Sequence, residues 1–445
     1  MTLFGKEVYD KVNELAKELR PEAVKFIQKL IQTPAISGEE FDLTELLIAE
    51  MKKLGYDEVF RDAQGNIVGM VHGEPGGPTI MYNSHMDHVS PGNPDNWEGY
   101  DPYGGLIDIC KVDNKDRTAV EEVECIHGRG ASDVKAGHGF QIYAGAVLIR
   151  LRELGHRFRG TFMYTGVVQE EPAEMVGMSY LIDNTFKERG LDYDAMVSSE
   201  ATSLNLYLGH RGRTEYLITT YGRTSHGSRP HYGINAIYKA IPVIQAIQNE
   251  LIPSLPADPD GDLENASLSL NIISCSPGAL SIVPDQCFLS LDRRTLPGET
   301  KETALAELQA ILDKVAASDP QFKGDVVVKS AVERSYTGME FDVAKDMAPW
   351  KTPKDHPFTK ACAEALESVG QEVSYGYWSF GTDGSKTAGI DKKPTIGFSG
   401  MQEQYAHTPI DKCRTDFIEL AIAGNASIFL KSSEMDKEEF KKLEF

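Results

Sequence analysis

Apolar residues recur along the first half of the chain with two alternating periods. Those at 24–31 repeat every three or four positions, which is typical of a helix, whereas short apolar runs such as 79–84 have the length of buried strands. Strands that alternate with helices indicate a mainly parallel sheet with helices on both faces. The expected elements are helices at 24–31, 43–55, 135–154 and 174–187 and strands at 67–71, 79–84, 160–168 and 195–199.

The pattern changes near Arg213, where a second α/β unit begins. Its predicted order is strand, helix, two strands, helix, strand, which is the ferredoxin-like arrangement. After about residue 331 the first pattern resumes. We therefore expect one domain formed by residues 1–212 and 331–445, with a second domain, 213–330, inserted into it. The predicted elements of the inserted unit and of the last segment are strands at 214–222, 266–274, 286–295, 325–330 and 394–398 and helices at 235 onwards, 300–316, 357–369 and 414–431.

Two local signals refine this picture. Ser37 and Glu40 have the spacing of a capping box for the helix that ends at Gly55. Residues 91–126 are rich in Gly, Pro, Asp and Asn, and they predict a long loop with a hairpin around 111–120.

Charge and composition exclude several classes of protein. The chain has 445 residues and a formal net charge of −22, which argues against a nucleic-acid partner because phosphate contacts need Lys and Arg. No apolar stretch is long enough to span a bilayer, and the first residues lack the pattern of a secretory signal. The six cysteines form no CxxC pair, which is typical of reduced thiols. We expect a cytoplasmic protein that contacts no membrane.

Acidic and histidine side chains follow the ends of several predicted strands. In an open α/β sheet, the carboxyl ends of the strands line the crevice where ligands bind. Carboxylates and imidazoles brought to one crevice from several strands are what a divalent metal needs. Each residue alone is a weak signal, but their shared placement predicts a metal site. The candidates are His85, Asp87, Asp133, Glu170, Glu171, Glu200 and His407.

Six motifs resemble, in order, those of a known enzyme family: NSHMDHV, GRGASDVKAG, TGVVQEEP, SSEAT, GRTSHGSRP and YAHTPID. The family is that of the di-zinc aminoacylases and acetylornithine deacetylases, with succinyl-diaminopimelate desuccinylase, carboxypeptidase G and cytosolic dipeptidases. The resemblance extends over nearly the whole chain, including the inserted domain. Within the family, VQEEP, HRGR and SLDRR…GET are most similar to the bacterial selenium-metabolism-linked hydrolase branch.

The resemblance implies a two-metal site. His85 and Glu200 would hold one zinc, Glu171 and His407 the other, and Asp133 would bridge them. Cobalt or manganese is also compatible with these ligands.

Further roles are implied for residues around the metals. Asp87 would hydrogen-bond to the far nitrogen of His85 and fix its tautomer. Glu170 would be the general base that takes a proton from the attacking water. His226 would reach the active site of a partner subunit and stabilise the developing oxyanion. Arg294 would bind a substrate carboxylate, while its neighbour Arg293 points to the other face of the strand.

The loop FGTDGSK matches a segment that lines the substrate pocket, which implicates Thr382 and Gly384. Three features depart from the family. Ser281 stands where many members have an Asn that contacts the substrate or oxyanion. Asp411 stands where Glu is common. The 91–126 loop is atypical and would reshape the entrance.

Together, the motifs imply a zinc-dependent hydrolase of the amide bond in a small N-acyl amino acid with an acetyl, succinyl or carbamoyl group. Its substrate would carry a carboxylate, and the enzyme would be a homodimer joined through its inserted domain.

Three alternatives remain. A dipeptidase or carboxypeptidase would need room and charge for a free amino group, and the sequence does not decide this. A non-catalytic metal-binding interaction protein would have lost the base or a ligand, yet all are present. A two-metal phosphoesterase fits the ligands, but the basic clamps of such sites are not seen clustered here.

Overall fold

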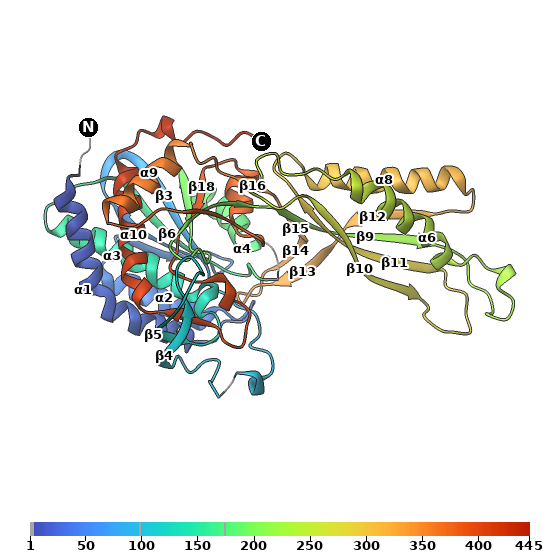
Figure 1. Ribbon diagram of the computed structural model, residues 1–445, viewed down its shortest axis with the longest axis horizontal. Helices are drawn as coiled ribbons and strands as arrows, with labels where there is room; N and C mark the ends of the chain where they lie inside the picture. The colour runs from blue at the N-terminus through green and yellow to red at the C-terminus, as the bar shows by residue number, and fades with distance from the viewer. Residues whose placement is uncertain (1–3, 98, 173–174) are drawn as a thin grey trace.

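The computed structural model describes residues 4–97, 99–172 and 175–445. Figure 1 shows a larger body in which helices surround a sheet, and a smaller arm that extends from it. The arm carries its own sheet and the helices α6 (Ala236–Ala246) and α8 (Lys301–Ser318). The inserted domain that the sequence predicts is this arm.

The sheet of the larger body is parallel at its centre, and antiparallel pairs occur on both flanks. The neighbours β6, β3, β7 and β18 are parallel, so that His85 pairs with Val167 and Asn83 with Ser198. The α/β fold class is therefore confirmed, with a sheet that is mixed overall. In spatial order the strands are β1 (Glu58–Arg61), β2 (Ile67–His72), β6 (Arg159–Val167), β3 (Glu74–His85), β7 (Ala195–Ser198), β18 (Thr395–Gly397), β8 (Leu206–His210) and β16 (Trp350–Lys351), with β17 (Tyr375–Trp378) also beside β8.

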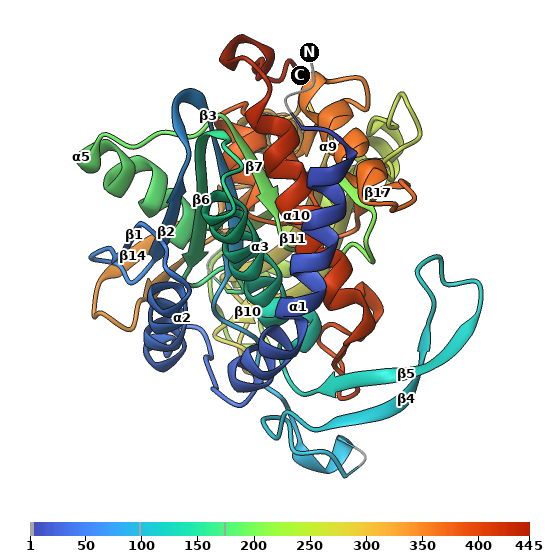
Figure 2. The ribbon, with the colours of Figure 1, turned by 90° about the vertical axis from the view of Figure 1, so that its left-hand side faces the viewer.

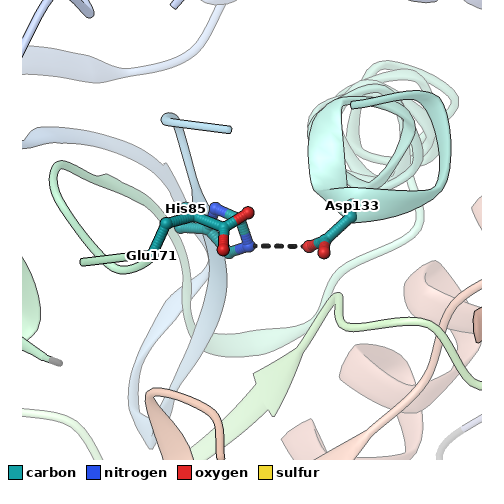
Figure 3. A group of neighbouring side chains, drawn as sticks. All are labelled: His85, Asp133 and Glu171. Atoms are coloured by element: carbon teal, nitrogen blue, oxygen red, sulfur yellow. Dashed lines mark hydrogen bonds and ion pairs between the residues drawn. The ribbon is translucent and has the colours of Figure 1, made fainter. Parts of the chain in front are cut away.

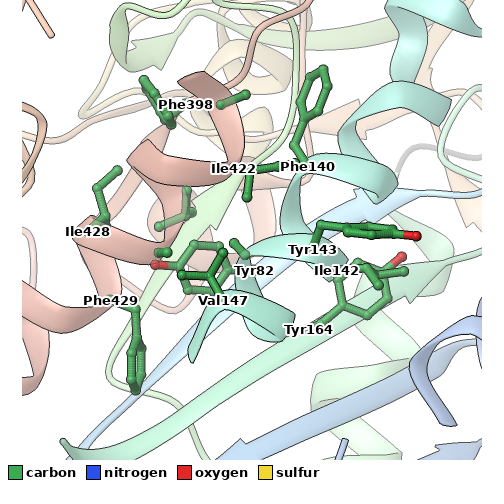
Figure 4. Close-up of a cluster of buried hydrophobic side chains, with 14 of the residues drawn as sticks. Tyr82, Phe140, Ile142, Tyr143, Val147, Tyr164, Phe398, Ile422, Ile428 and Phe429 are labelled. Atoms are coloured by element: carbon green, nitrogen blue, oxygen red, sulfur yellow. The ribbon is translucent and has the colours of Figure 1, made fainter. Parts of the chain in front are cut away.

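Helices cover both faces of this sheet. Ile80 and Tyr82 face the core formed with the long helices, whereas Met81 between them faces a second core on the other side. This alternation is the period of two of a strand that is buried on both faces. Figure 4 shows Tyr82 packed beside Phe429 and Val147 in the first core.

The long helices that form the first core pack against one another (Figure 2). Short helices cover the other face. The first residue of the helix expected at 174–187 lies outside the described residues. The helices of the larger body are α1 (Lys6–Ile31), α2 (Phe41–Leu54), α3 (Ala136–Glu153), α4 (Val176–Tyr180), α5 (Lys187–Arg189), α9 (Pro357–Ser368) and α10 (Asp416–Ser433). No helix in the described part of the chain is both long enough and apolar enough to cross a membrane.

The arm has the predicted strand–helix–strand–strand–helix–strand order. Its antiparallel sheet runs β10, β11, β9, β12, and residues such as Tyr216, Leu289 and Leu308 form a separate core beneath its helices. The bounds are β9 (Gly212–Tyr221), β10 (Ser267–Ser276), β11 (Gln286–Thr295) and β12 (Gly324–Val328), and a short helix α7 (Ile252–Ser254) follows α6.

The chain returns to the larger sheet later than the predicted boundary at 331. The hairpin of β13 (Ser330–Arg334) and β14 (Glu340–Ala344) comes first, and β15 (Asp346–Met347) then pairs with β9 of the arm. β16 is the first strand after the arm to rejoin the larger sheet. These strands are too short for an apolar pattern to reveal them.

Part of the predicted 91–126 loop is a regular hairpin. β4 (Ile107–Asp113) pairs with β5 (Val120–His127), and β5 also pairs with β19 (Lys412–Arg414). Figure 2 shows this hairpin at the edge of the larger body.

The predicted capping box at the start of α2 is wrong. α2 begins without a side-chain cap, although it ends at Gly55 with a left-handed φ of 86°, as expected. The Ser37 hydroxyl donates to Asp87 at 2.6 Å instead. Glu40 accepts from the N–H groups of Gly38 and Gln169. Both side chains therefore bond to residues at the ends of strands β3 and β6. The spacing of Ser37 and Glu40 in the sequence does not reveal these contacts.

Candidate active site

The predicted metal ligands lie together at one edge of the larger sheet. His85 is the last residue of β3, and Glu171 and Glu200 follow β6 and β7. Asp133 lies in the turn before α3, and His407 lies in the loop after β18. Because β6, β3, β7 and β18 are parallel neighbours, their carboxyl ends open onto the same crevice.

Asp133 lies between the two histidines. One of its carboxylate oxygens is 3.0 Å from His85 Nε2, and the other is 2.9 Å from His407 Nε2. Figure 3 shows Asp133 facing His85, with Glu171 beside them. His85 Nε2 also lies 3.5 Å from a Glu200 oxygen, and His407 Nε2 lies 3.1 Å from Glu171. The five side chains form a continuous series with Asp133 at its centre.

The donors and charges of this cluster fit divalent metal ions. Ligand atoms of His85, Asp133 and Glu171 lie within 4.8 Å of one another. Burial raises the pKa of Glu200 well above its usual value, although His85 opposes the shift, and hydrogen bonds to Asp133 and Glu171 raise the pKa of His407 to about 10. Carboxylates held this close repel one another unless a cation or proton lies among them. Nitrogen and oxygen donors of this kind suit zinc, cobalt or manganese.

Glu170 lies beside the cluster without being part of the series. It lines the same pocket as Glu171 and Glu200. Burial raises the pKa of its carboxyl group well above the usual range, with His85 opposing the shift and Glu200 adding to it. A carboxyl group with a raised pKa next to a metal site is suited to accept and return a proton.

Asp87 contacts His85 and the end of β6 through its backbone and its carboxylate. The nitrogen His85 Nδ1 lies 2.9 Å from the backbone oxygen of Asp87 and 3.6 Å from its carboxylate. The carboxylate also accepts the N–H groups of Glu170 and Glu171, at 3.0 and 3.2 Å, and the hydroxyl of Ser37. Asp87 therefore orients three site residues, one through its backbone and two through its side chain.

Asp411 stands where Glu is common in the family. It connects the two loops that carry the predicted ligands Asp133 and His407. Its buried carboxylate accepts the N–H groups of Gly130 and Ser132 at 2.8 and 2.9 Å, and Arg129 lies 3.1 Å away. Burial raises its pKa to about 7, although Arg129 opposes the shift. Asp411 thus links the loop of His407 to the turn of Asp133.

A pocket of about 420 Å³ opens above the cluster. The arm contributes one wall with Arg213, Asp292 and Arg294, together with Met347 of β15. The larger body contributes the other wall, which comprises Phe380, Gly381, Glu403 and Ala406.

Arg294 lines the pocket with its guanidinium already oriented. It contacts Asp292 through two nitrogens, at 2.7 and 3.2 Å. Arg213 lies 3.4 Å from the same carboxylate. Arg293 points to the opposite face of β11, where it is 1% exposed and pairs with Glu299. The two faces follow from the period of two of a strand.

Thr382 and Gly384 are not among the residues that line this pocket. Both are buried behind it, where the Thr382 N–H and hydroxyl contact His210 Nε2 at 2.9 and 3.1 Å. A Cβ on Gly384 would lie 2.4 Å from Trp350. The neighbouring Phe380 and Gly381 form the wall instead.

His226 lies on the arm, away from the residues that line the pocket. It is exposed, and its Nδ1 accepts the N–H of Ser228 at 3.1 Å. Ser281, the departure from the family pattern, lies beside it, because the carbonyl of Ser281 accepts the N–H of Gly227 at 2.7 Å.

Sequence reasoning missed several residues of the site. Ser37 orients Asp87, and Arg213, Asp292 and Glu403 line the pocket. Asp383 is buried beside the cluster, accepts a hydrogen bond from Asn83 at 2.8 Å, and has its pKa raised by burial to about 6. The one available signal was its place between Thr382 and Gly384.

Comparisons with known proteins agree with this architecture. Residues 208–320 match the model of the M20 peptidase dimerisation domain. The chain is 32% identical over 402 residues to an uncharacterised protein, YgeY, from Escherichia coli K12, which covers 90% of this chain and 91% of the relative. It is 24% identical to a succinyl-diaminopimelate desuccinylase from Methylobacterium, over 70% of this chain and 76% of the relative.

Solved structures share the fold over nearly the whole chain. The aminopeptidase PepT of Bacillus cereus has a TM-score of 0.65 at 20% identity and covers 94% of this chain and 99% of its own. YxeP of Bacillus subtilis, described as a dinuclear metal-binding peptidase of the M20 family, has a TM-score of 0.63 at 15% identity and covers 94% and 99%. At these identities the likeness shows the fold alone. The match to the M20 dimerisation domain and the relatives that cover most of the chain, a desuccinylase among them, show that the chain is a hydrolase of the M20 metallopeptidase family.

Proposed function

We propose that the protein hydrolyses the amide bond of a small N-acyl amino acid whose acyl group is acetyl, succinyl or carbamoyl. The observation that carries this proposal is the position of Glu170, which lies next to five metal-type ligands in a pocket that Arg294 also lines. A volume of about 420 Å³ suits a small substrate. The relative named as a desuccinylase adds support for this substrate class.

The metal ligands are proposed to be shared between two zinc ions. His85 and Glu200 would hold one ion, His407 and Glu171 the other, and Asp133 would be shared by both. When bound, the ions would polarise the amide carbonyl and make the attacking water more acidic.

Glu170 accepts the proton of that water and returns it to the leaving nitrogen. Asp87 holds the backbone of Glu170 while the proton moves, because its carboxylate accepts the Glu170 N–H. Arg294, which lines the pocket, binds the carboxylate of the substrate through its guanidinium, while Asp292 keeps the group in place.

The active enzyme is proposed to be a homodimer formed through the arm, residues 213–330, with the catalytic domain made of 1–212 and 331–445. The arm exposes apolar side chains that suit burial against a second copy. His226 of that copy would then reach the pocket and stabilise the developing oxyanion. The exposed apolar residues include Ile237, Tyr238, Ile241, Ile272, Ile273 and Leu280. The six free cysteines favour the cytoplasm as its compartment.

Glu170→Gln tests the central assignment. We expect turnover to fall by at least about a hundredfold, which is the rate contribution of a general base, while the metal content is unchanged. Metal analysis and steady-state kinetics on N-acetyl, N-succinyl, N-carbamoyl and dipeptide substrates measure both quantities. Glu153→Gln, on the exposed end of α3, is the matched control. Near-normal turnover of Glu170→Gln with metal bound would remove Glu170 as the base, and hydrolysis of no amide by the metal-loaded unaltered protein would refute the substrate class.

A further inference from the structure

The hairpin β4–β5 contacts all four side chains of the segment 402–405, which leads into His407. Gln402 Nε2 donates to the Asp113 backbone oxygen at 2.9 Å, and Gln404 Nε2 donates to the Asp113 carboxylate at 3.0 Å. The Asp113 N–H donates to the hydroxyl of Tyr405 at 3.1 Å.

The remaining side chain of this segment lines the substrate pocket. Glu403 lies 3.9 Å from Arg117 in the turn of the hairpin. A single residue of the hairpin, Asp113, therefore holds three of the four side chains, and Arg117 approaches the fourth.

The same hairpin also holds the chain after His407. Arg414 Nη1 donates to the Asp113 backbone oxygen at 3.0 Å and lies 2.7 Å from Glu121. Thr415 donates to Glu124 at 2.9 Å, and β19 pairs with β5. Both ends of the His407 loop thus rest on one element.

His407 needs such support, because its own surroundings are open. Its side chain is 52% exposed, and its backbone has a φ of 58° in the left-handed region, which a non-glycine residue adopts only when the surrounding structure holds it there. The contacts of its imidazole, to Asp133 and Glu171, are themselves part of the metal cluster.

We propose that the β4–β5 hairpin is a positioning element that fixes residues 402–407, and that Asp113 is its central residue. Through His407 it maintains the affinity of the metal position shared with Glu171, a consequence that rests on the proposed function. The position of His85 and Glu200 does not depend on it, because His85 ends β3 and Glu200 directly follows β7 in the central sheet.

Two variants test the proposal. The first replaces residues 111–122 by Asn-Gly, which joins the paired residues Cys110 and Val123 through a tight turn and removes Asp113, Arg117 and Glu121. The second, Asp113→Ala with Tyr405→Phe, removes two of the contacts and leaves the backbone intact. Glu122→Gln is the control, since Glu122 is exposed on the same hairpin and its side chain has no hydrogen bond or ion pair within the described residues.

Hydrogen exchange of the metal-free proteins, followed by mass spectrometry, measures directly how firmly the hairpin holds residues 402–408. We expect the amides of 402–408 to exchange at least about tenfold faster in both hairpin variants, and those of 195–200 to exchange at the rate of the unaltered protein. Titration with Co²⁺, followed by visible absorption, should show about tenfold weaker binding at one of the two positions and unchanged binding at the other.

The outcomes separate this proposal from the proposed function. The hairpin proposal is overturned if exchange at 402–408 is unchanged in the folded double variant. It is also overturned if exchange becomes faster uniformly throughout the protein. If the shortened chain does not fold, the double variant decides alone. If the unaltered protein binds no divalent metal, the proposed function fails, and the exchange measurement still decides whether the hairpin supports the loop.

Discussion

Asp87 accepts three hydrogen bonds through one buried carboxylate, from the Ser37 hydroxyl and from the N–H groups of Glu170 and Glu171. A carboxylate satisfied in this way is rigid, and it fixes the strand end that carries two site residues. Of these three donors, Ser37 alone donates from a side chain. A substitution of Ser37 can therefore disturb the orientation of Asp87 without changing a predicted metal ligand.

Ser37→Ala should weaken metal binding by about tenfold, because Asp87 loses a charge-assisted hydrogen bond and holds Glu171 less firmly. Equilibrium dialysis or calorimetry with zinc measures this change. Ser90→Ala, at an exposed position in the loop after β3, should leave the zinc affinity unchanged. A loss of folding stability with unchanged zinc affinity would contradict the prediction and leave Ser37 a purely structural residue.

At the level of elements, the loop that forms one pocket wall is anchored behind the wall. His210 ends β8, and its Nδ1 donates to the Arg211 carbonyl at 2.8 Å while Nε2 accepts the N–H of Thr382. This arrangement requires a neutral imidazole, and burial lowers the pKa of His210 to about 4. Thr382 thus acts through the position of Phe380 and Gly381 and does not contact the pocket itself.

The buried His210 should make the protein less stable in acid. Its pKa is near 6.5 in the unfolded chain and about 4 in the folded one, so between these values the unfolded state binds the extra proton. Its contribution to the unfolding free energy is fully present above pH 6.5 and is lost, at up to about 1.4 kcal/mol per pH unit, as the pH falls towards 4.

Urea denaturation at pH 7, 5.5 and 4.5 measures this loss. His210→Gln, which does not titrate, should show a shallower dependence on pH than the unaltered protein, whereas His72→Gln, at an exposed position of β2, should not. Parallel curves for His210→Gln and the unaltered protein would show that His210 does not titrate in this range.

At the level of the whole molecule, the arm places His226 outside the set of residues that line the pocket of the same chain. His226 is exposed on the arm near Ser281, while the pocket residues of the arm, such as Arg294, lie at the base of its sheet. A catalytic role for His226 therefore requires a second copy of the chain.

Mixing two inactive variants tests that requirement. In a heterodimer of Glu170→Gln and His226→Asn chains, one of the two sites has both an intact Glu170 and an intact His226. Random pairing should restore about a quarter of the activity. A mixture of Glu170→Gln with His85→Ala is the control, since every site then lacks one residue of its own chain. Activity no higher than that of the separate variants, or full activity of His226→Asn alone, would contradict the shared site.

Much of the fold could be predicted because the apolar pattern is local. The strands that end at His85 and Ser198 and the six elements of the arm all have enough residues to show their period. The short strands β15 and β16 do not, and they decide where the arm rejoins the larger sheet. The grouping of His85, Asp133, Glu171, Glu200 and His407 was predictable because parallel neighbouring strands bring their ends to one crevice.

By itself, the sequence determined the classes of residue at the strand ends, the order of the elements and the insertion of the arm, since each depends on neighbours along the chain. Only the tertiary structure decided what these residues contact. It turned Ser37 from a helix cap into a partner of Asp87, moved Thr382 behind the pocket wall, and placed Asp113 against the loop of His407. These contacts join residues that lie 50 to more than 290 positions apart, and side chains so distant in sequence meet only where the packing of sheets and helices brings them together.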